Sequence, residues 1–245
     1  MNFNNICFIL NDIKLKKIEK KIINLLINKM SIPRNITKEF EDKTEEQIRL
    51  EINKRSYPYN IIALNIHGCL NVGNMMRTSN LCGCKKFIIF GRRYYDKRSC
   101  VGTDKYINYE RVDGIKSGVM NELKTVLGAE DYLLDPEIFI NYIIDNNILP
   151  IFIEQDELSI QCNDSNITTI IKESEKLNKT PTFIFGNETT GIPKNILETR
   201  NQLDHSYTLQ LKQMGSMQSY NVSNCCAILG YKIMEIFDNI NITNI

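Results

Sequence analysis

Tryptophan is absent from the 245-residue chain, and histidine occurs only twice. An excess of charge of one sign is also lacking, because 30 Lys and Arg stand against 29 Asp and Glu. A strongly basic or acidic tail protein is therefore excluded, and a polyanionic partner would have to be recognised by a local cluster of charge. Hydrophobic residues make up 42% and charged residues 24% of the chain, which are ordinary values for a globular protein.

The eight cysteines lack the C-x-x-C spacing of paired zinc ligands. Cys82 and Cys84 are too close together for such a pair, and Cys225 and Cys226 fall within a helical pattern. We therefore expect no metal site and expect reduced, mostly buried thiols, which are typical of a reducing compartment. A cytoplasmic location is the expectation, and a nuclear or organellar location stays open.

Long apolar runs are also lacking, so no membrane-spanning helix is expected. At the N-terminus a short apolar stretch precedes a basic run, which is the reverse of a secretory signal. The fingerprints G-x-G-x-x-G, G-x-x-x-x-G-K-[ST] and G-x-S-x-G do not occur. The absence of the first two weakens the case for a nicotinamide dehydrogenase and a P-loop NTPase. The glycine-rich first loop of the usual Rossmann-type methyltransferase is also absent.

Residues 1–55 have the character of a helical N-terminal extension. Residues 12–30 carry apolar residues at helical spacing behind a possible cap at Asp12, and residues 37–54 give a second, highly charged helical pattern. For the second helix a loosely packed, solvated role is slightly favoured. For the first, with its many lysines, the choice between that role and RNA binding stays open.

From residue 56 to residue 245 strands alternate with helices, and the strands are continuous apolar runs. This pattern predicts an α/β domain with a mostly parallel sheet covered on both faces. Strands are expected at residues 60–66, 87–90, 149–153, 182–185 and 207–211. Helices are expected at residues 72–82, 117–127, 136–146, 165–177 and 217–237, and a short helix opens at Pro193.

The first of three polar loops runs from Asn71 to Arg77 and leads from a strand into a helix. Asn71 is expected to cap that helix, and Asn74 and Arg77 share one helical face. Because ligands of open α/β sheets bind at the carboxyl ends of strands, an arginine here can bind a phosphate with two hydrogen bonds. A capped helix with a surface arginine is the alternative.

The second loop contains Gly186 and Gly191, which allow the backbone to approach a ligand closely. Glu188 lies between them and is expected to need a cationic or hydroxyl partner. The third loop, residues 213–224, precedes the last helix and holds more small polar side chains than one helix cap needs. An ordinary strand-to-helix turn and simple capping are the respective alternatives.

These loops, in this order and spacing over residues 60–237, resemble the motifs of the SpoU/TrmH branch of the SPOUT RNA methyltransferases. The matching segments are Asn71 to Arg77, Gly186-x-Glu188-x-x-Gly191, and Leu211-x-Gln213-x-Gly215-x-x-x-Ser219-Tyr220-Asn221-Val222-Ser223. Residues 1–55 lie outside the resemblance. Each motif alone is weak, and their joint register makes the match specific.

The resemblance implies a parallel-sheet SPOUT domain with a deep C-terminal trefoil knot, a homodimer, and methyl transfer from S-adenosylmethionine to a ribose 2′-hydroxyl of tRNA or rRNA. The cofactor-binding residues that it implies are Gly186, Gly191, Leu211 and Tyr220. The catalytic residues that it implies are Arg77, Asn71, Glu188, Ser219 and Asn221. Two positions depart from the family pattern, because Tyr220 replaces the usual leucine and Lys212 a common proline.

Arg77 has two possible roles in this reaction. A guanidinium hardly loses its proton, so we favour a phosphate clamp that also stabilises the developing oxyanion over a general base. Glu188 and Asn221 would orient the arginine and the substrate. The methyl donor is a sulfonium cation, so the reaction needs no metal.

Basic and aromatic residues are interleaved between Lys85 and Lys105, a composition that suits contacts to an RNA backbone and to unstacked bases. A solvated loop is the alternative. The RNA-binding candidates are Lys85, Lys86, Arg92, Arg93, Lys97 and Arg98.

The last helix carries an apolar stripe of Cys226, Leu229, Ile233 and Ile236. This stripe is either core or a dimer face, and we expect it at or near the homodimer interface. Two other functions are weighed against the enzyme: a catalytically inactive RNA-binding subunit that retains the fold, and a small-molecule α/β enzyme. The presence of Asn71, Arg77, Glu188 and Asn221 argues against the first, and the basic segment against the second.

Overall fold

The computed structural model describes residues 35–91, 95–115 and 134–243. Its contacts divide the chain into two compact units, residues 1–42 and residues 43–245. The helices expected at residues 12–30 and 117–127 lie outside the described residues. Within the described residues, no helix has the length and apolar character that crossing a membrane requires.

The helix expected at residues 37–54 is divided into two elements. A short 3-10 turn, Lys38–Phe40, lies in the first unit, and α2, Glu45–Arg55, lies in the second. A capping box starts α2, because Thr44 Oγ1 accepts from Gln47 N and the Gln47 side chain accepts from Thr44 N. The domain boundary that we place after residue 55 stays a prediction.

The described part of the second unit contains a sheet of seven strands in the order β3-β2-β1-β6-β4-β7-β5. All neighbouring strands are parallel. Their bounds are β1 Tyr57–Leu64, β2 Cys84–Phe90, β3 Tyr109–Val112, β4 Ile148–Ile153, β5 Ile160–Gln161, β6 Thr180–Phe185 and β7 Tyr207–Gln210. The predicted α/β class with a parallel sheet is confirmed.

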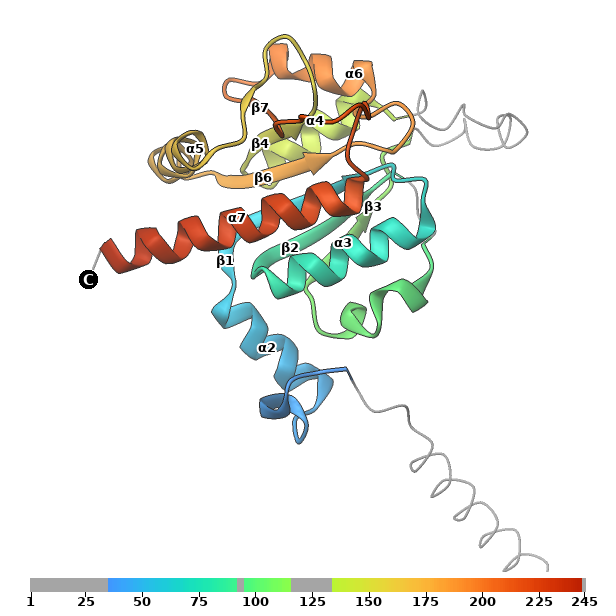
Figure 1. Ribbon diagram of the computed structural model, residues 1–245, viewed down its shortest axis with the longest axis vertical. Helices are drawn as coiled ribbons and strands as arrows, with labels where there is room; N and C mark the ends of the chain where they lie inside the picture. Colours follow the sequence, from blue (N-terminus) through green and yellow to red (C-terminus); the bar gives the residue numbers. More distant parts are fainter. Residues whose placement is uncertain (1–34, 92–94, 116–133, 244–245) are drawn as a thin grey trace, which may run out of the picture. The chain divides into compact units, whose positions relative to one another are not determined.

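Helices cover both faces of this sheet. Successive side chains along a strand point to opposite faces, and each face packs against its own apolar cluster. Tyr59, Ile61 and Ala63 of β1 pack into the cluster that contains α3, α5 and α7, whereas Ile62 and Leu64 pack into the cluster that contains α4. The helix bounds are α3 Cys69–Leu81, α4 Pro136–Asp145, α5 Asp164–Lys176, α6 Lys194–Leu197 and α7 Val222–Thr243. Figure 1 shows α3 and α7 side by side.

Two expected helix starts are wrong, and in both cases another residue ends the loop. α3 begins at Cys69 with Gly68 at the N-cap, so Asn71 lies inside the first turn. α7 begins at Val222 and not at residue 217, because Asn221 Oδ1 accepts hydrogen bonds from Ser223 N and Ser223 Oγ, as a capping side chain does.

The apolar stripe of α7 is core within a single chain. Cys226, Leu229 and Ile233 are at most 1% exposed and Ile236 is 5% exposed, and all four belong to the cluster shared with α3 and the sheet. The stripe is therefore not itself a dimer face, and a homodimer interface near it stays a prediction. Its side chains are already covered by α3 and β1, so none of them is available to a second subunit.

Candidate functional site

A cavity of about 420 Å³ opens at the carboxyl ends of β4, β6 and β7, which are neighbours in the sheet. Its wall consists of residues at the ends of these strands and in the loops after them: residues 153–155, 185–191, 209–211, 213 and 218–222, together with Cys225. Such an edge of an open parallel sheet is where ligands of α/β proteins bind. The volume falls in the range of about 300–1,000 Å³ that is usual for small-molecule sites.

Seven of the residues proposed from the sequence line this cavity. The four cofactor candidates are all among them, and so are three of the five catalytic candidates: Gly186, Gly191, Leu211, Tyr220, Glu188, Ser219 and Asn221. Asn71 is joined to the wall by hydrogen bonds. Arg77 is not part of the wall.

The loop after β6 is a closed turn, and its own backbone leaves no room for a side chain at Gly186. Asn187 and Gly191 exchange two backbone hydrogen bonds of 2.9 and 3.1 Å. A Cβ at Gly186 would approach the backbone of Gly191 and Ile192 to well under 3.0 Å. The sequence suggested close approach by a ligand, and the structure shows that the loop's own backbone fills the space first.

Asn187 organises the interior of this turn and was not among the candidates. Its Oδ1 accepts from Thr189 N at 2.8 Å and Thr190 N at 2.9 Å, and its Nδ2 donates to Thr190 Oγ1 at 2.8 Å. The side chain is only 4% exposed. Asparagine is a common turn residue for this reason, so its position in the motif was the available signal.

Glu188 binds the N-terminus of α3. Its Oε2 accepts from His67 N at 3.0 Å, and its Oε1 accepts from Gly68 N at 3.0 Å and from Asn71 Nδ2. Burial alone would raise the pKa of Glu188, but the hydrogen bonds from Asn71 and from the backbone lower it below the usual value. The expected cationic or hydroxyl partner is therefore wrong: the partners are amide N–H groups, which hold an ionised carboxylate.

The hydrogen bonds continue from Asn71 to the start of α7. Asn71 Oδ1 accepts from Asn221 Nδ2 at 3.3 Å, and Asn221 Oδ1 accepts from Ser223 N and Ser223 Oγ at 2.9 and 2.7 Å. One chain of polar side chains therefore joins all three loops that the sequence singled out. The amide groups are fixed on two sides, so their orientation is set before any ligand binds.

Arg77 lies on the exposed surface of α3. It is six residues beyond Asn71, which corresponds to about 9 Å along a helix axis. Within the described part of the chain, it makes no hydrogen bond and no ion pair. Its guanidinium is thus available to a ligand larger than the cavity can hold.

The two positions that depart from the motif pattern contact each other. Tyr220 Oη donates to the backbone oxygen of Lys212 at 3.2 Å, and this bond closes the third loop. The side chain of Tyr220 lines the cavity and is 44% exposed. A hydrogen bond across the loop therefore provides some of the restraint that a proline at position 212 would give.

The described basic candidates have partners within the chain. Lys85 donates to Asn53 O at 2.9 Å, and Lys86 pairs with Glu110 at 2.7 Å. Both lysines are near the amino end of β2, whereas the cavity is at the carboxyl ends of the strands. Lys97 lies 3.9 Å from Asp104, and Arg98 pairs with Asp96. Arg92 and Arg93 lie outside the described residues, and RNA binding by this set stays a prediction.

Two further residues of the cavity wall, Glu154 and Gln155, follow β4 and were missed. No motif marks them, because they end a short apolar strand with ordinary polar residues. Among the described residues, no group of three or more His, Cys, Asp or Glu could hold a metal ion. The described cysteines are free thiols.

No protein-family model matches the sequence, and no curated protein does. Solved structures do match. The crystal structure of an A. aeolicus TrmH/SpoU tRNA modifying enzyme is 16% identical, with a TM-score of 0.56 over 80% of this chain and 84% of that chain. An AdoMet-bound rRNA methyltransferase from Sinorhizobium meliloti is 17% identical, with a TM-score of 0.51 over 75% of this chain and 59% of that one.

At these identities the likeness establishes the fold. The chain has the fold of the SpoU/TrmH RNA methyltransferases, so the parallel-sheet α/β fold implied by the three motifs is confirmed, whereas the trefoil knot stays a prediction. The described chain thus unites this fold with a cavity and a polar side-chain network at the expected edge of the sheet.

Proposed function

We propose that this protein is an S-adenosylmethionine-dependent RNA methyltransferase that modifies a ribose 2′-hydroxyl of tRNA or rRNA. The observation that carries the proposal is the hydrogen-bonded chain from Glu188 through Asn71 to Asn221 at the rim of the cavity. It joins three loops that are far apart in the sequence and that match the three motifs. A fold shared with a cofactor-bound rRNA methyltransferase supports the same reading.

The charges of the cavity wall fit a sulfonium cofactor. Two carboxylates, Glu154 and Glu188, line the cavity, whereas its described wall contains no Lys, Arg or His. A cationic ligand is favoured by such a wall, and a phosphate-bearing nucleotide is disfavoured. Gly186, Gly191 and Leu211 line the cavity and would contact the adenosyl part. When bound, S-adenosylmethionine would supply an electrophilic methyl group.

The residues of the chain then have separate tasks. Glu188 stays ionised and orients Asn71, and Asn71 in turn orients Asn221. Arg77, which is exposed and not engaged within the described chain, clamps a phosphate of the RNA and stabilises negative charge on the ribose oxygen. The hydroxyl proton leaves to water or to a neighbouring phosphate. Ser219, at the cavity wall, contacts the substrate.

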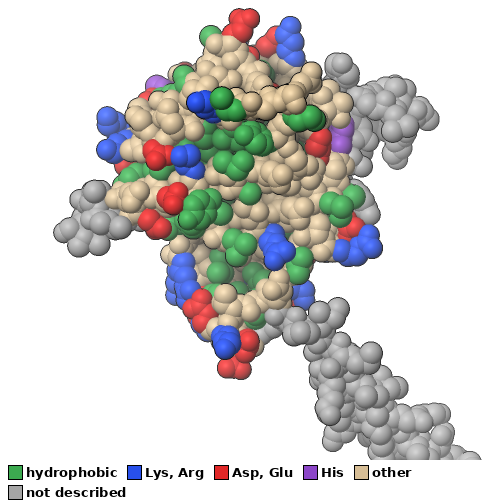
Figure 2. All heavy atoms as spheres, viewed as in Figure 1, with side chains coloured by type: hydrophobic (Ala, Val, Ile, Leu, Met, Phe, Trp, Pro, Cys, Tyr) green, Lys and Arg blue, Asp and Glu red, His purple; other side chains and the backbone are tan. Residues whose placement is uncertain are grey.

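A homodimer and a C-terminal trefoil knot belong to the same proposal. The contact from Gln155 Nε2 to Gln218 O, at 2.9 Å, holds the third loop beside the loop after β4. Because the stripe is buried, we place the dimer interface on the outer face of α7. Ile228 and Tyr231 are 43% and 55% exposed there, and Figure 2 shows apolar side chains among charged ones on the face that α7 crosses.

The test is methyl transfer to RNA. Purified protein is incubated with S-adenosylmethionine and total tRNA or rRNA that lacks modifications, and the digested nucleosides are analysed by mass spectrometry. A 2′-O-methylated nucleoside is expected. Methylation of a base would contradict the ribose assignment. RNA binding without any methyl transfer would instead support the inactive RNA-binding subunit.

A further inference from the structure

The loop that follows β4 lies outside the three motifs, yet it contributes a carboxylate to the cavity. Glu154 N donates to Leu209 O at 3.1 Å, so the residue continues the pairing of β4 with β7. It therefore stands directly at the carboxyl end of a central strand. Its side chain lines the cavity and is only partly exposed.

Two backbone N–H groups fix the orientation of this carboxylate. Oε2 accepts from Ile192 N at 2.7 Å, and Oε1 accepts from Gln155 N at 2.9 Å. Each oxygen of an ionised carboxylate can accept two hydrogen bonds. After these two bonds, each carboxylate oxygen of Glu154 can still accept one more hydrogen bond. Both oxygens belong to a side chain that lines the cavity.

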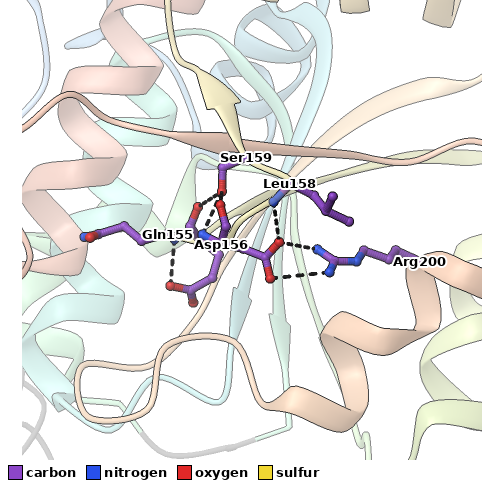
Figure 3. A network of polar contacts seen from close by, with 6 residues as sticks. Gln155, Asp156, Leu158, Ser159 and Arg200 are labelled. Atoms are coloured by element: carbon purple, nitrogen blue, oxygen red, sulfur yellow. Dashed lines mark hydrogen bonds and ion pairs between the residues drawn. The ribbon is translucent and has the colours of Figure 1, made fainter.

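The loop itself is braced, as Figure 3 shows. Arg200 donates to both carboxylate oxygens of Asp156, at 2.9 and 3.3 Å, and both side chains are about one-fifth exposed. Ser159 Oγ donates to Glu154 O at 3.0 Å. The position of Glu154 is thus set from both ends, and a ligand meets a preorganised acceptor.

Glu154 also differs from the other acidic residue of the wall. Glu188 already accepts three hydrogen bonds from α3 and its N-terminal residues, whereas Glu154 accepts one on each oxygen. Two parallel acceptors on one carboxylate match the two hydroxyl donors of a ribose cis-diol. An acidic side chain at the end of a strand recognises ribose hydroxyls in the same way in dinucleotide-binding sheets.

We propose that Glu154 binds the 2′- and 3′-hydroxyls of the ribose of an adenosyl ligand, one on each carboxylate oxygen. The inference rests on the proposed function, because it takes the cavity to be the cofactor site. It assigns a side chain that selects the sugar of the cofactor, in a site otherwise formed mostly by backbone groups.

The experiment measures ligand affinities by calorimetry while both the ligand and residue 154 are varied. The affinities of S-adenosylhomocysteine and its 2′-deoxy and 3′-deoxy analogues are compared for the unmodified protein, Glu154→Ala and Glu154→Gln. The unmodified protein should bind each deoxy analogue about tenfold or more weakly, as is typical for loss of a hydrogen bond to a charged group. Glu154→Ala should bind all three with similar, reduced affinity.

Glu157→Gln is the matched control, because Glu157 lies in the same loop, is exposed and is not part of the cavity wall. It should retain the discrimination of the unmodified protein. If Glu154→Ala does not fold, Glu154→Gln decides, since its amide keeps an acceptor for Ile192 N and removes one hydroxyl acceptor. Unchanged discrimination in the folded Glu154 variant overturns the proposal.

A third ligand separates the ribose from the amino-acid part. 5′-Methylthioadenosine has the ribose but no ammonium group, so its affinity should fall about tenfold in Glu154→Ala if Glu154 binds the diol. Unchanged affinity would assign Glu154 to the ammonium group and overturn the inference. If the unmodified protein binds none of these ligands, the cofactor proposal fails as well, whereas binding without Glu154 dependence overturns only this inference.

Discussion

At Glu188 two effects on one carboxyl group oppose each other. Burial favours the neutral acid, and the hydrogen bonds from Asn71, His67 N and Gly68 N favour the carboxylate; the hydrogen bonds win, so the pKa is lowered. A lowered folded-state pKa stabilises the fold above the ordinary value of about 4.5, and this contribution is lost as the pH falls through the folded value. Glu188 therefore behaves as a structural anion that holds α3 to the second loop.

Glu188→Gln should lower the free energy of unfolding by about 1 kcal/mol at pH 7, a modest figure because the group is partly exposed to solvent. The difference from the unmodified protein should shrink as the pH falls through the lowered pKa of Glu188, because the protonated acid and the amide are then both neutral. Denaturant unfolding between pH 7 and pH 3 measures this. The exposed Glu157→Gln serves as control, and a difference that grows at acidic pH would contradict the assignment.

Arg77 is exposed and makes no described contact, so replacing it should leave stability within about 0.5 kcal/mol. Arg77→Ala should nevertheless lower the single-turnover methylation rate about a hundred- to a thousandfold with cofactor affinity unchanged. Arg77→Lys should restore little, because an ammonium cannot make the forked contact. Lys172→Ala on α5, also an exposed cation on a helix, is the control. A near-normal rate in Arg77→Ala would remove Arg77 from the catalytic set.

Among the elements, the loop after β6 depends on backbone packing. Gly186→Ala places a Cβ against the backbone of Gly191 and Ile192, and overpacking of this kind costs about 1–3 kcal/mol. The variant should lose stability and cofactor affinity together. Gly215→Ala is the matched control, since a Cβ there meets no atom within 4 Å. Thermal unfolding separates them, and equal stability of the two variants would show that the turn adjusts freely.

The sequence could predict those elements whose apolar pattern is strong. The central strands and the helices around them were predicted within a few residues, because continuous apolar runs and helical stripes mark them. β3 was missed because Glu110 and Arg111 interrupt its apolar pattern at the sheet edge, and β5 because it has two exposed residues. The site loops were predicted from glycine and polar clusters. Glu154 was missed, because its place in the cavity wall depends on the contact with Ile192, which is distant in the sequence.

The two faces of α7 should respond differently to a charge. Ile233 is fully buried, so Ile233→Glu should unfold the chain or cost several kcal/mol. Tyr231 is 55% exposed, so Tyr231→Glu should keep the fold and weaken the proposed dimer. Urea unfolding and sedimentation velocity measure the two effects. A folded, monomeric Ile233→Glu protein would restore the stripe as an interface.

Across the second unit as a whole, the cavity is formed by loops that follow three different strands and is connected by hydrogen bonds to the N-termini of α3 and α7. A ligand bound there contacts segments more than 60 residues apart in the sequence, such as Glu154 and Tyr220. Binding therefore stabilises the folded state, in which these segments are together, over the unfolded chain, in which they are apart.

S-Adenosylhomocysteine at about 100 times its dissociation constant should add about 2.7 kcal/mol to the free energy of unfolding. For a domain of this size, that raises the midpoint of thermal unfolding by roughly 5–10 °C. ATP at the same concentration should raise it little, because its phosphates would meet Glu154 and Glu188 in a cavity whose described wall has no cation to pair with them. Differential scanning calorimetry with both ligands makes the comparison. Stabilisation by ATP as large as that by S-adenosylhomocysteine would contradict the charge argument on which the cofactor assignment rests.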